Sequence, residues 1–499
     1  MSRTAPIALT VVDALLLPGA DAGPEWFFGW LQVGDDGRIV AMGPGEPPPD
    51  AHATPVLDAG GAIVAPGFVS AHSHLFTSGL RGIAPDSTLY PWVRSMMELF
   101  RHTEAEDMYW ATLHGSLDFL ANGVTSAYNF MQSGVTWLYD PSTARNVLGR
   151  VHPDEYTTRQ MDGTVDAGLR AVHAIRLDDE SGPEEQVLER FGRMVDAARA
   201  PERAGRDQHL GVSVMGAVQW AAAPRTAELE ALVMREHGVT DQAHFVETAE
   251  GLDVQRAKFA WYDDAGALGP DLLLGHFVHP TDAMVHRVAE AGSPVVWQPT
   301  SNGRLGSGVA DVVRYRAAGI DVGIGLDDQS CTDVSDPWSN MRLGLYSQRA
   351  LHQDAAVLSA RDVLRMHTLG SAEVLGVADR VGSLEVGKHA DFVLVDHRAP
   401  STGPVWDVVA TYVLACGLRN LRATYVGGRC VARDGRATTP LAERADAELA
   451  ERIERAAHAD GRRLAVTAEQ LVSARARGVE AARGVAGPGR LTAPEGARA

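Results

Sequence analysis

The stretch PGFVSAHSHLFTSGLRG at Pro66–Gly82 contains a short apolar run, starting at Phe68, that ends in His72 and His74. Because alternate residues of a strand point to the same side, both imidazoles would face the same way at the end of a strand. An HxH pair alone is weak evidence for a metal site, since 18 histidines among 499 residues would give roughly 0.6 such pairs by chance. Its meaning depends on the rest of the chain.

Beyond this stretch, short apolar segments alternate with longer helical patterns, which is typical of repeated β–α units. Eight strands are predicted: one ending near His74, then Val124–Phe130, Leu169–Ile175, Leu210–Val218, Gln242–Phe245, Leu272–His276, Pro294–Trp297 and Val322–Asp327. The helical patterns between them include Glu184–Ala198, Ala227–Glu236, Thr281–Ala291 and Val309–Ala318. Eight such units predict an α/β fold, a (β/α)8 TIM barrel.

One helix of this series carries its own start and stop signals. Thr103 and Glu106 have the spacing of a capping box, and apolar residues then recur at helical spacing up to Gly123. We therefore expect a helix capped by Thr103 ahead of the strand Val124–Phe130.

The two ends of the chain have a different pattern. Ala8–Ala59 and Gly382–Gly435 contain short strand-like pieces interrupted by glycine-rich turns. We predict one small β-sandwich-like domain built from residues 1–61 and 378–440, beside a barrel domain at residues 62–377. Residues 441–499 are rich in alanine, arginine and glutamate, which predicts a helical extension and a frayed tail.

Composition restricts the possible partners. The chain has 45 lysines and arginines against 64 aspartates and glutamates, a formal net charge of −19. Such an acidic surface repels phosphate backbones and anionic membranes, so we expect a small-molecule substrate, with no nucleic acid and no membrane as partner. The three cysteines form no CxxC pair, and no stretch approaches the ~20 uninterrupted apolar residues of a spanning helix. These features favour a cytoplasmic protein.

Metal-ligating side chains recur where the predicted strands end. His244 ends the fifth strand and Glu247 follows three residues later; His276 ends the sixth strand and Asp327 the eighth. The carboxyl ends of barrel strands share the face on which this fold builds its active sites. Three imidazoles and a carboxylate can hold zinc or a similar divalent ion. Asp328 is the rival ligand, but neighbouring strand residues face opposite sides, so only one of the two can point inward.

The chain resembles the amidohydrolase superfamily over nearly its whole length to about residue 440, in six motifs that occur in the family's order. They are PGFVSAHSHLFTSGLRG at Pro66–Gly82, AHFVETAE at Ala243–Glu250, GHFVH at Gly275–His279, PTSNGRLGSG at Pro299–Gly308, GIGLDDQS at Gly323–Ser330 and GSLEVGKHADFVLVD at Gly382–Asp396. Within the superfamily it is most similar to the branch of cytosine deaminase, adenosylhomocysteine deaminase and triazine hydrolase.

This resemblance implies a site for one divalent metal ion, with zinc favoured over iron, manganese or cobalt. The family's ligands correspond to His72, His74, His244 and Asp327. Binuclear branches use a lysine at the end of the fourth strand, and the segment Leu210–Val218 has none. One ion is therefore expected.

The resemblance also implies catalytic and binding roles. The ion would lower the pKa of its water toward neutrality. Asp327 would act as general base, Glu247 would pass a proton to a ring nitrogen, and His276 would orient the nucleophile or bind the tetrahedral centre. The candidate substrate-binding residues are Trp92, on the long loop where the family forms a substrate lid, together with Asn302 and Asp328.

These residues favour hydrolytic deamination, in which water attacks an sp2 carbon of a nitrogen heterocycle and ammonia or an amine leaves. An amide, urea, thiocarbamate or halide hydrolase on the same metal site is the alternative, because three positions depart from the deaminase pattern: Trp297–Gln298, Leu326 and Asp328. A non-catalytic scaffold is a third reading, disfavoured because every ligand remains. The family often forms homo-oligomers, so the resemblance implies one here.

Overall fold

A ring of parallel strands forms the centre of the computed structural model, which describes residues 6–49, 55–140, 142, 145–203, 206–467 and 469–470. The strand order is β15-β14-β13-β12-β11-β10-β7-β6-β16. The bounds are β6 Phe68–His74, β7 Val124–Phe130, β10 Arg170–Ile175, β11 His209–Gly216, β12 Thr240–Phe245, β13 Leu272–His276, β14 Val295–Trp297, β15 Val322–Ile324 and β16 Asp327–Asp328.

The eighth strand of this ring is interrupted. Its first piece, β15, pairs with β14, and its second piece, β16, pairs with β6, so the ring closes through two fragments separated by Gly325 and Leu326. Strands β6, β7 and β10 are buried at every position, as expected of parallel strands covered on both faces. The predicted TIM-barrel fold is confirmed.

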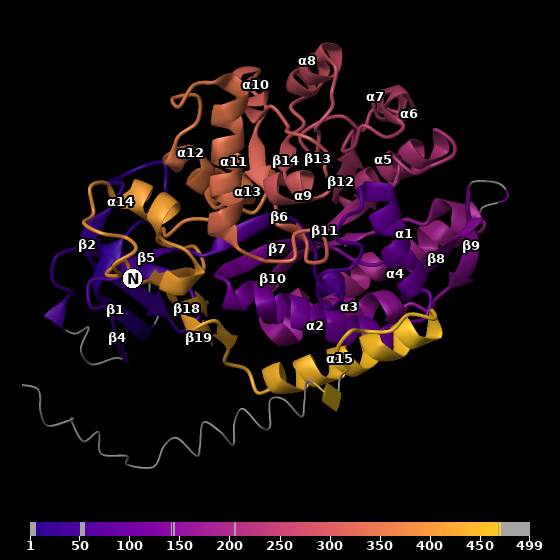
Figure 1. Cartoon of the computed structure of the whole chain (residues 1–499). Helices are drawn as coiled ribbons and strands as arrows, with labels where there is room; N and C mark the ends of the chain where they lie inside the picture. The colour runs from indigo at the N-terminus through magenta and orange to yellow at the C-terminus, as the bar shows by residue number, and fades with distance from the viewer. Residues whose placement is uncertain are drawn as a thin grey trace, which may run out of the picture.

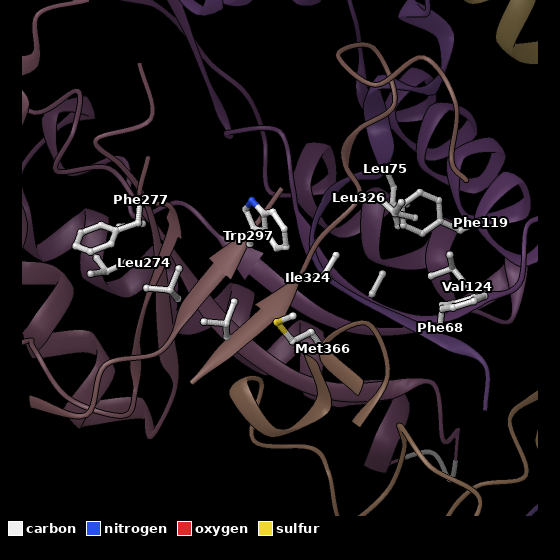
Figure 2. Close-up of a cluster of buried hydrophobic side chains, with 14 of the residues drawn as sticks. Phe68, Leu75, Phe119, Val124, Leu274, Phe277, Trp297, Ile324, Leu326 and Met366 are labelled. Carbon is white, nitrogen blue, oxygen red and sulfur yellow. The ribbon is translucent and has the colours of Figure 1, made fainter. Parts of the chain in front are cut away.

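Helices cover the outside of the ring (Figure 1). They are α2 Ala105–Ala121, α3 Glu155–Ala167, α4 Glu184–Arg203, α5 Arg225–His237, α6 Leu252–Ala257, α7 Phe259–Asp264, α8 Asp282–Ala291, α9 Pro299–Arg304, α10 Val312–Ala317, α11 Pro337–His352, α12 Ala360–Met366 and α13 Leu369–Val374. Figure 2 shows part of the core that strands and helices share, including Phe68, Val124, Leu274, Ile324 and Met366.

The predicted capping box of α2 is wrong by one residue. The N-cap is Glu104, whose box is completed by Asp107. Thr103 instead donates its hydroxyl to the Phe100 carbonyl and contacts the Tyr156 hydroxyl at 2.8 Å. A hairpin of β8 (Val135–Asp140) and β9 (Arg145–Val151), which the sequence analysis missed, lies between β7 and α3.

The two flanks of the chain form one mixed sheet beside the barrel. Its order is β20-β19-β18-β17-β5-β1-β2-β3, with β4 paired to β1, and Figure 1 shows the indigo and orange strands side by side. The bounds are β1 Ile7–Leu16, β2 Phe27–Gly34, β3 Ile39–Pro44, β4 Val56–Asp58, β5 Ile63–Pro66, β17 Phe392–Val395, β18 Leu421–Val426, β19 Arg429–Arg433 and β20 Arg436–Ala437; α14 (Val408–Ala410) follows β17 in the chain. The antiparallel pair β5–β17 joins the flanks, and a buried cluster that includes Val11, Leu31, Val64 and Phe392 forms the core.

Three helical segments lie near the carboxyl end of β6. A 3-10 helix, η2 (Leu75–Leu80), follows β6 directly, and α1 (Leu89–Phe100) comes next. The C-terminal helix α15 (Leu441–Ala459, yellow in Figure 1) packs on both and on α2. Most of the predicted tail lies outside the described residues. Among the described helices, none has the length and apolar character needed to cross a membrane.

Candidate metal centre

Four side chains from three separate parts of the barrel meet at the carboxyl ends of the strands. His72 and His74 come from β6, His244 from β12 and Asp327 from β16. The Nε2 atoms of His74 and His244 are 3.1 Å apart. Oδ1 of Asp327 lies 3.4 Å from Nε2 of His72 and 3.7 Å from Nε2 of His74. The four groups thus point their donor atoms at one small volume.

These separations suit a bound divalent ion. Ligand atoms about 2.1 Å from a tetrahedral zinc lie roughly 3.4 Å from one another, which is close to the three measured distances. Nε2 of His72 is buried and has no hydrogen-bond partner among the described residues. A buried imidazole nitrogen without a partner is costly, and a metal ion is one group that satisfies it. Two overlapping triads have donor atoms close enough together to hold a metal ion: His72, His74 and His244, and His72, His276 and Asp327.

The electrostatics of the cluster keep its lone pairs available. Burial, followed by the charge of His72, lowers the pKa of His74 to about 3, and burial lowers that of His244 well below its ordinary value. Burial alone would raise the pKa of Asp327, but the neighbouring imidazoles, His72 foremost, hold it well below its ordinary value. Neutral imidazoles beside an ionised carboxylate are the protonation states that metal ligation requires.

Glu247 and His276 lie beside this cluster. Nε2 of His276 is 3.6 Å from Oε2 of Glu247 and 3.9 Å from Oδ2 of Asp327. Burial, then the charge of Asp327, raises the pKa of Glu247 well above its ordinary value, while burial lowers that of His276 to about 3. The site therefore favours the ionised form of Asp327, the protonated form of Glu247 and the neutral form of His276.

The backbone is strained where it presents these groups. His276 has φ +65°, Asp327 has φ +64°, and Val246, next to Glu247, has φ +44°. Residues with a side chain rarely adopt this left-handed region, and such strain clusters at functional sites. This backbone conformation occurs just after β12, at the last residue of β13 and at the first residue of β16, where the site's polar side chains are presented.

The three predicted substrate-binding residues lie close to the cluster, each with a partner of its own. Trp92 is buried and donates its Nε1–H to the carbonyl of Ser330 at 3.2 Å. Nδ2 of Asn302 is 2.9 Å from Nδ1 of His276. Oδ1 of Asp328 accepts from the backbone and hydroxyl of Ser330. Their role in binding substrate stays a prediction.

Several neighbours of the cluster were missed from sequence. Phe130 places its ring 4.5 Å from the His72 ring and 4.8 Å from the His74 ring, and Trp220 lies 5.4 Å from the His244 ring. Gln242 accepts from Nδ1 of His72. Strand alternation offered a signal for Gln242, which stands two residues before His244 and so faces the same side.

Comparisons with known proteins find similar sequences over most of the chain. The model of the amidohydrolase family matches residues 63–431. The chain is 31% identical over 409 residues to a 5-methylthioadenosine/S-adenosylhomocysteine deaminase of Symbiobacterium thermophilum, covering 80% of this chain and 87% of that protein.

Two solved structures have the same fold. An adenosine deaminase from Xanthomonas campestris with bound zinc has a TM-score of 0.76 at 23% identity, covering 91% of this chain and 99% of that one. Atrazine chlorohydrolase from Arthrobacter aurescens, complexed with zinc, has a TM-score of 0.76 at 21% identity, covering 89% and 100%.

Proposed function

Because the chain belongs to the amidohydrolase family and is one of its hydrolases, we propose that it is a mononuclear zinc deaminase. Its reaction replaces an amino group on an sp2 carbon of a purine-like nitrogen heterocycle with oxygen, consuming water and releasing ammonia. The observation that carries this proposal is a pair of buried carboxyl groups, Glu247 and Asp327, which lie 3.6 Å and 3.9 Å from Nε2 of His276 and whose pKa values are shifted in opposite directions.

The proposed ligands are His72, His74, His244 and Asp327. When bound, the ion supplies Lewis acidity, which makes a water molecule acidic enough to ionise near neutral pH. Asp327 has an ionised carboxylate at this point, so it accepts the proton that the attacking water loses. Its second oxygen, Oδ2, faces His276 and keeps that proton near the reacting carbon.

The protonated carboxyl of Glu247 then has a separate task. It donates a proton to a ring nitrogen of the heterocycle, which withdraws electrons from the adjacent carbon and makes it a better electrophile. His276 is neutral, and its Nε2 atom lies between the two carboxyl groups, where it hydrogen-bonds the oxygen that develops charge. A raised pKa on one carboxyl and a lowered pKa on the other is the arrangement of an acid–base pair.

The relatives support deamination and keep one alternative open. The deaminase of Symbiobacterium thermophilum aligns over most of this chain. The shared fold with atrazine chlorohydrolase and the unusual residues Trp297, Leu326 and Asp328 favour a halide leaving group as the second candidate. We further propose that the enzyme is cytoplasmic, in keeping with its three free cysteines. We also propose that it is a homo-oligomer, as the family resemblance implies.

The test begins with zinc content and ammonia release. Purified enzyme is analysed for metal and assayed with aminated purines and their nucleosides, cytosine, aminotriazines and chlorotriazines. We expect about one zinc per chain, ammonia from at least one purine-like compound, and a loss of kcat of about 10²–10⁴-fold in Glu247→Gln with zinc retained.

Each other outcome has a clear meaning. Chloride without ammonia would replace deamination by the halide reaction. A chain that binds no zinc, or a Glu247→Gln variant as active as the wild type, would refute the proposed mechanism.

A further inference from the structure

Two buried carboxamide side chains contact the Nδ1 atoms of two histidines in the cluster. Oε1 of Gln242 lies 2.5 Å from Nδ1 of His72, and Nδ2 of Asn302 lies 2.9 Å from Nδ1 of His276. All four side chains are at most 1% exposed. Because an amide oxygen can only accept and an amide N–H can only donate, these two buried side chains determine which nitrogen of each imidazole carries a proton.

The orientation of Gln242 is fixed by the backbone. Its Nε2 atom donates to the carbonyl of Ala71 at 3.0 Å, and a carbonyl can only accept. Oε1 must therefore face His72, so Nδ1 of His72 carries the proton. The opposite nitrogen, Nε2, is left with a free lone pair, and it lies 3.4 Å from Oδ1 of Asp327.

Asn302 presents the opposite group. Its Nδ2–H donates to Nδ1 of His276, which leaves the imidazole proton on Nε2. The Nε2 atom lies 3.6 Å from Oε2 of Glu247 and 3.9 Å from Oδ2 of Asp327, and it has no hydrogen-bond partner among the described residues, so its N–H is available to a bound substrate. Asn302 is itself held on α9, where its backbone N–H donates to Gln298, and Gln298 in turn accepts from the backbone N–H of His276.

We propose that Gln242 and Asn302 are positioning residues that set opposite tautomers on His72 and His276. His72 is held as a metal ligand with its Nε2 lone pair exposed, whereas His276 is held as a hydrogen-bond donor to the reacting centre. This inference rests on the proposed function, because it says which histidine of that site binds the ion and which one stabilises charge.

The two amides therefore affect different measurements. Loss of Gln242 frees the His72 ring to rotate or to change tautomer, so it weakens metal binding. Loss of Asn302 leaves the metal ligands untouched but removes the constraint on the proton of His276, so it lowers kcat. If both amides were merely structural, both variants would lose thermal stability. Zinc affinity and kcat would then not respond differently in the two variants.

The experiment compares zinc affinity, by chelator competition, with steady-state kinetics in four variants. We expect Gln242→Leu to bind zinc about 10–100-fold more weakly. Gln242→Glu keeps the acceptor oxygen toward His72 but loses the donor toward the Ala71 carbonyl, so it should restore part of that affinity. Asn302→Leu should bind zinc within about twofold of wild type while kcat falls at least about tenfold. Gln160→Leu, which removes a buried amide of α3 far from the cluster in the sequence, is the control and should keep wild-type zinc affinity.

The inference and the proposed function fail in different ways. A wild-type enzyme that binds no zinc would remove the proposed function. If the wild-type enzyme binds zinc, two results would overturn the tautomer assignment alone. One is a Gln242→Leu variant with wild-type zinc affinity; the other is an Asn302→Leu variant that loses as much zinc affinity as Gln242→Leu. Circular dichroism melting identifies any variant that fails to fold, and for such a variant the conservative Gln242→Glu or Asn302→Gln substitution decides in its place.

Discussion

At the scale of single residues, the break in the eighth strand explains how His72 is held. Gly325 lies between β15 and β16, and a Cβ there would lie 2.5 Å from Cβ of His72 and 2.9 Å from its backbone nitrogen and oxygen. These atoms belong to a buried strand and cannot rotate away. We infer that only glycine allows the eighth strand to approach the first so closely.

We therefore predict that Gly325→Ala displaces His72 and lowers zinc affinity by about tenfold or more, because small errors in ligand position weaken coordination. Zinc titration against a chelator measures this. Gly211→Ala is the matched control, since the added methyl would meet only Val172, at 3.8 Å. Wild-type zinc affinity in Gly325→Ala would show that the strand adjusts without cost.

The sequence predicts which residues form the site better than it predicts which groups each of them contacts. His72, His74, His244, His276 and Asp327 were found because each ends an apolar segment, and strand ends of a barrel share one face. The contacts of Gln242 and Asn302 were not predictable, because an amide hydrogen bond depends on which strands become neighbours in space. The burial of Trp92 against Ser330 likewise follows from how α1 packs.

At the scale of whole elements, the C-terminal helix α15 holds the segments that follow β6. A Cβ added at Gly79 of η2 would lie 2.6 Å from Cγ1 of Ile453, so the two elements touch without a gap. At the end of α15, Asp460 pairs with Arg101 just after α1 at 2.9 Å. The helix therefore supports the two segments that follow the carboxyl end of β6.

We predict that Ile453→Ala destabilises this contact by about 2–4 kcal/mol and loosens η2 and α1. Hydrogen exchange should become faster at residues 75–100, and KM should rise while zinc affinity stays unchanged. Glu451→Ala, on the exposed side of the same helix, is the control. Unchanged exchange at residues 75–100 would show that α15 packs on these segments without restraining them.

Elements with strong periodicity were predicted well and irregular ones were not. The bounds of β7 and β13 match the sequence prediction residue for residue. The N-cap of α2 is Glu104 and not the predicted Thr103, because the Thr103 hydroxyl donates to the Phe100 carbonyl and closes the turn after α1. The hairpin β8–β9 was missed because its strands are partly exposed and lack the long apolar runs that mark the barrel strands.

At the scale of the whole molecule, one buried ion pair connects the barrel to the sheet formed by the flanks. Arg170 of β10 donates through Nε to Oδ2 of Asp391 at 2.6 Å and through a second nitrogen to Oδ1 at 3.1 Å. Asp391, just before β17, also accepts from the backbone of Gly427, and its carbonyl accepts from Gly67 where the chain enters the barrel. A fixed bidentate pair thus joins both sheets at the crossing point of the chain.

We predict that Asp391→Ala lowers the free energy of unfolding by about 3 kcal/mol, because the fully buried guanidinium of Arg170 keeps only one counterion, Asp207, which lies 3.1 Å away and is 46% exposed. The double variant Arg170→Met with Asp391→Leu should lose less, since both buried charges are removed together and Asp207, which loses its arginine, is 46% exposed to water. Urea unfolding followed by tryptophan fluorescence measures both. Asp379→Ala, which removes a carboxylate that is 79% exposed and 3.9 Å from Arg380, should change stability by less than about 1 kcal/mol. If Asp391→Ala were no more harmful than this exposed change, the two sheets would be held together by apolar packing alone.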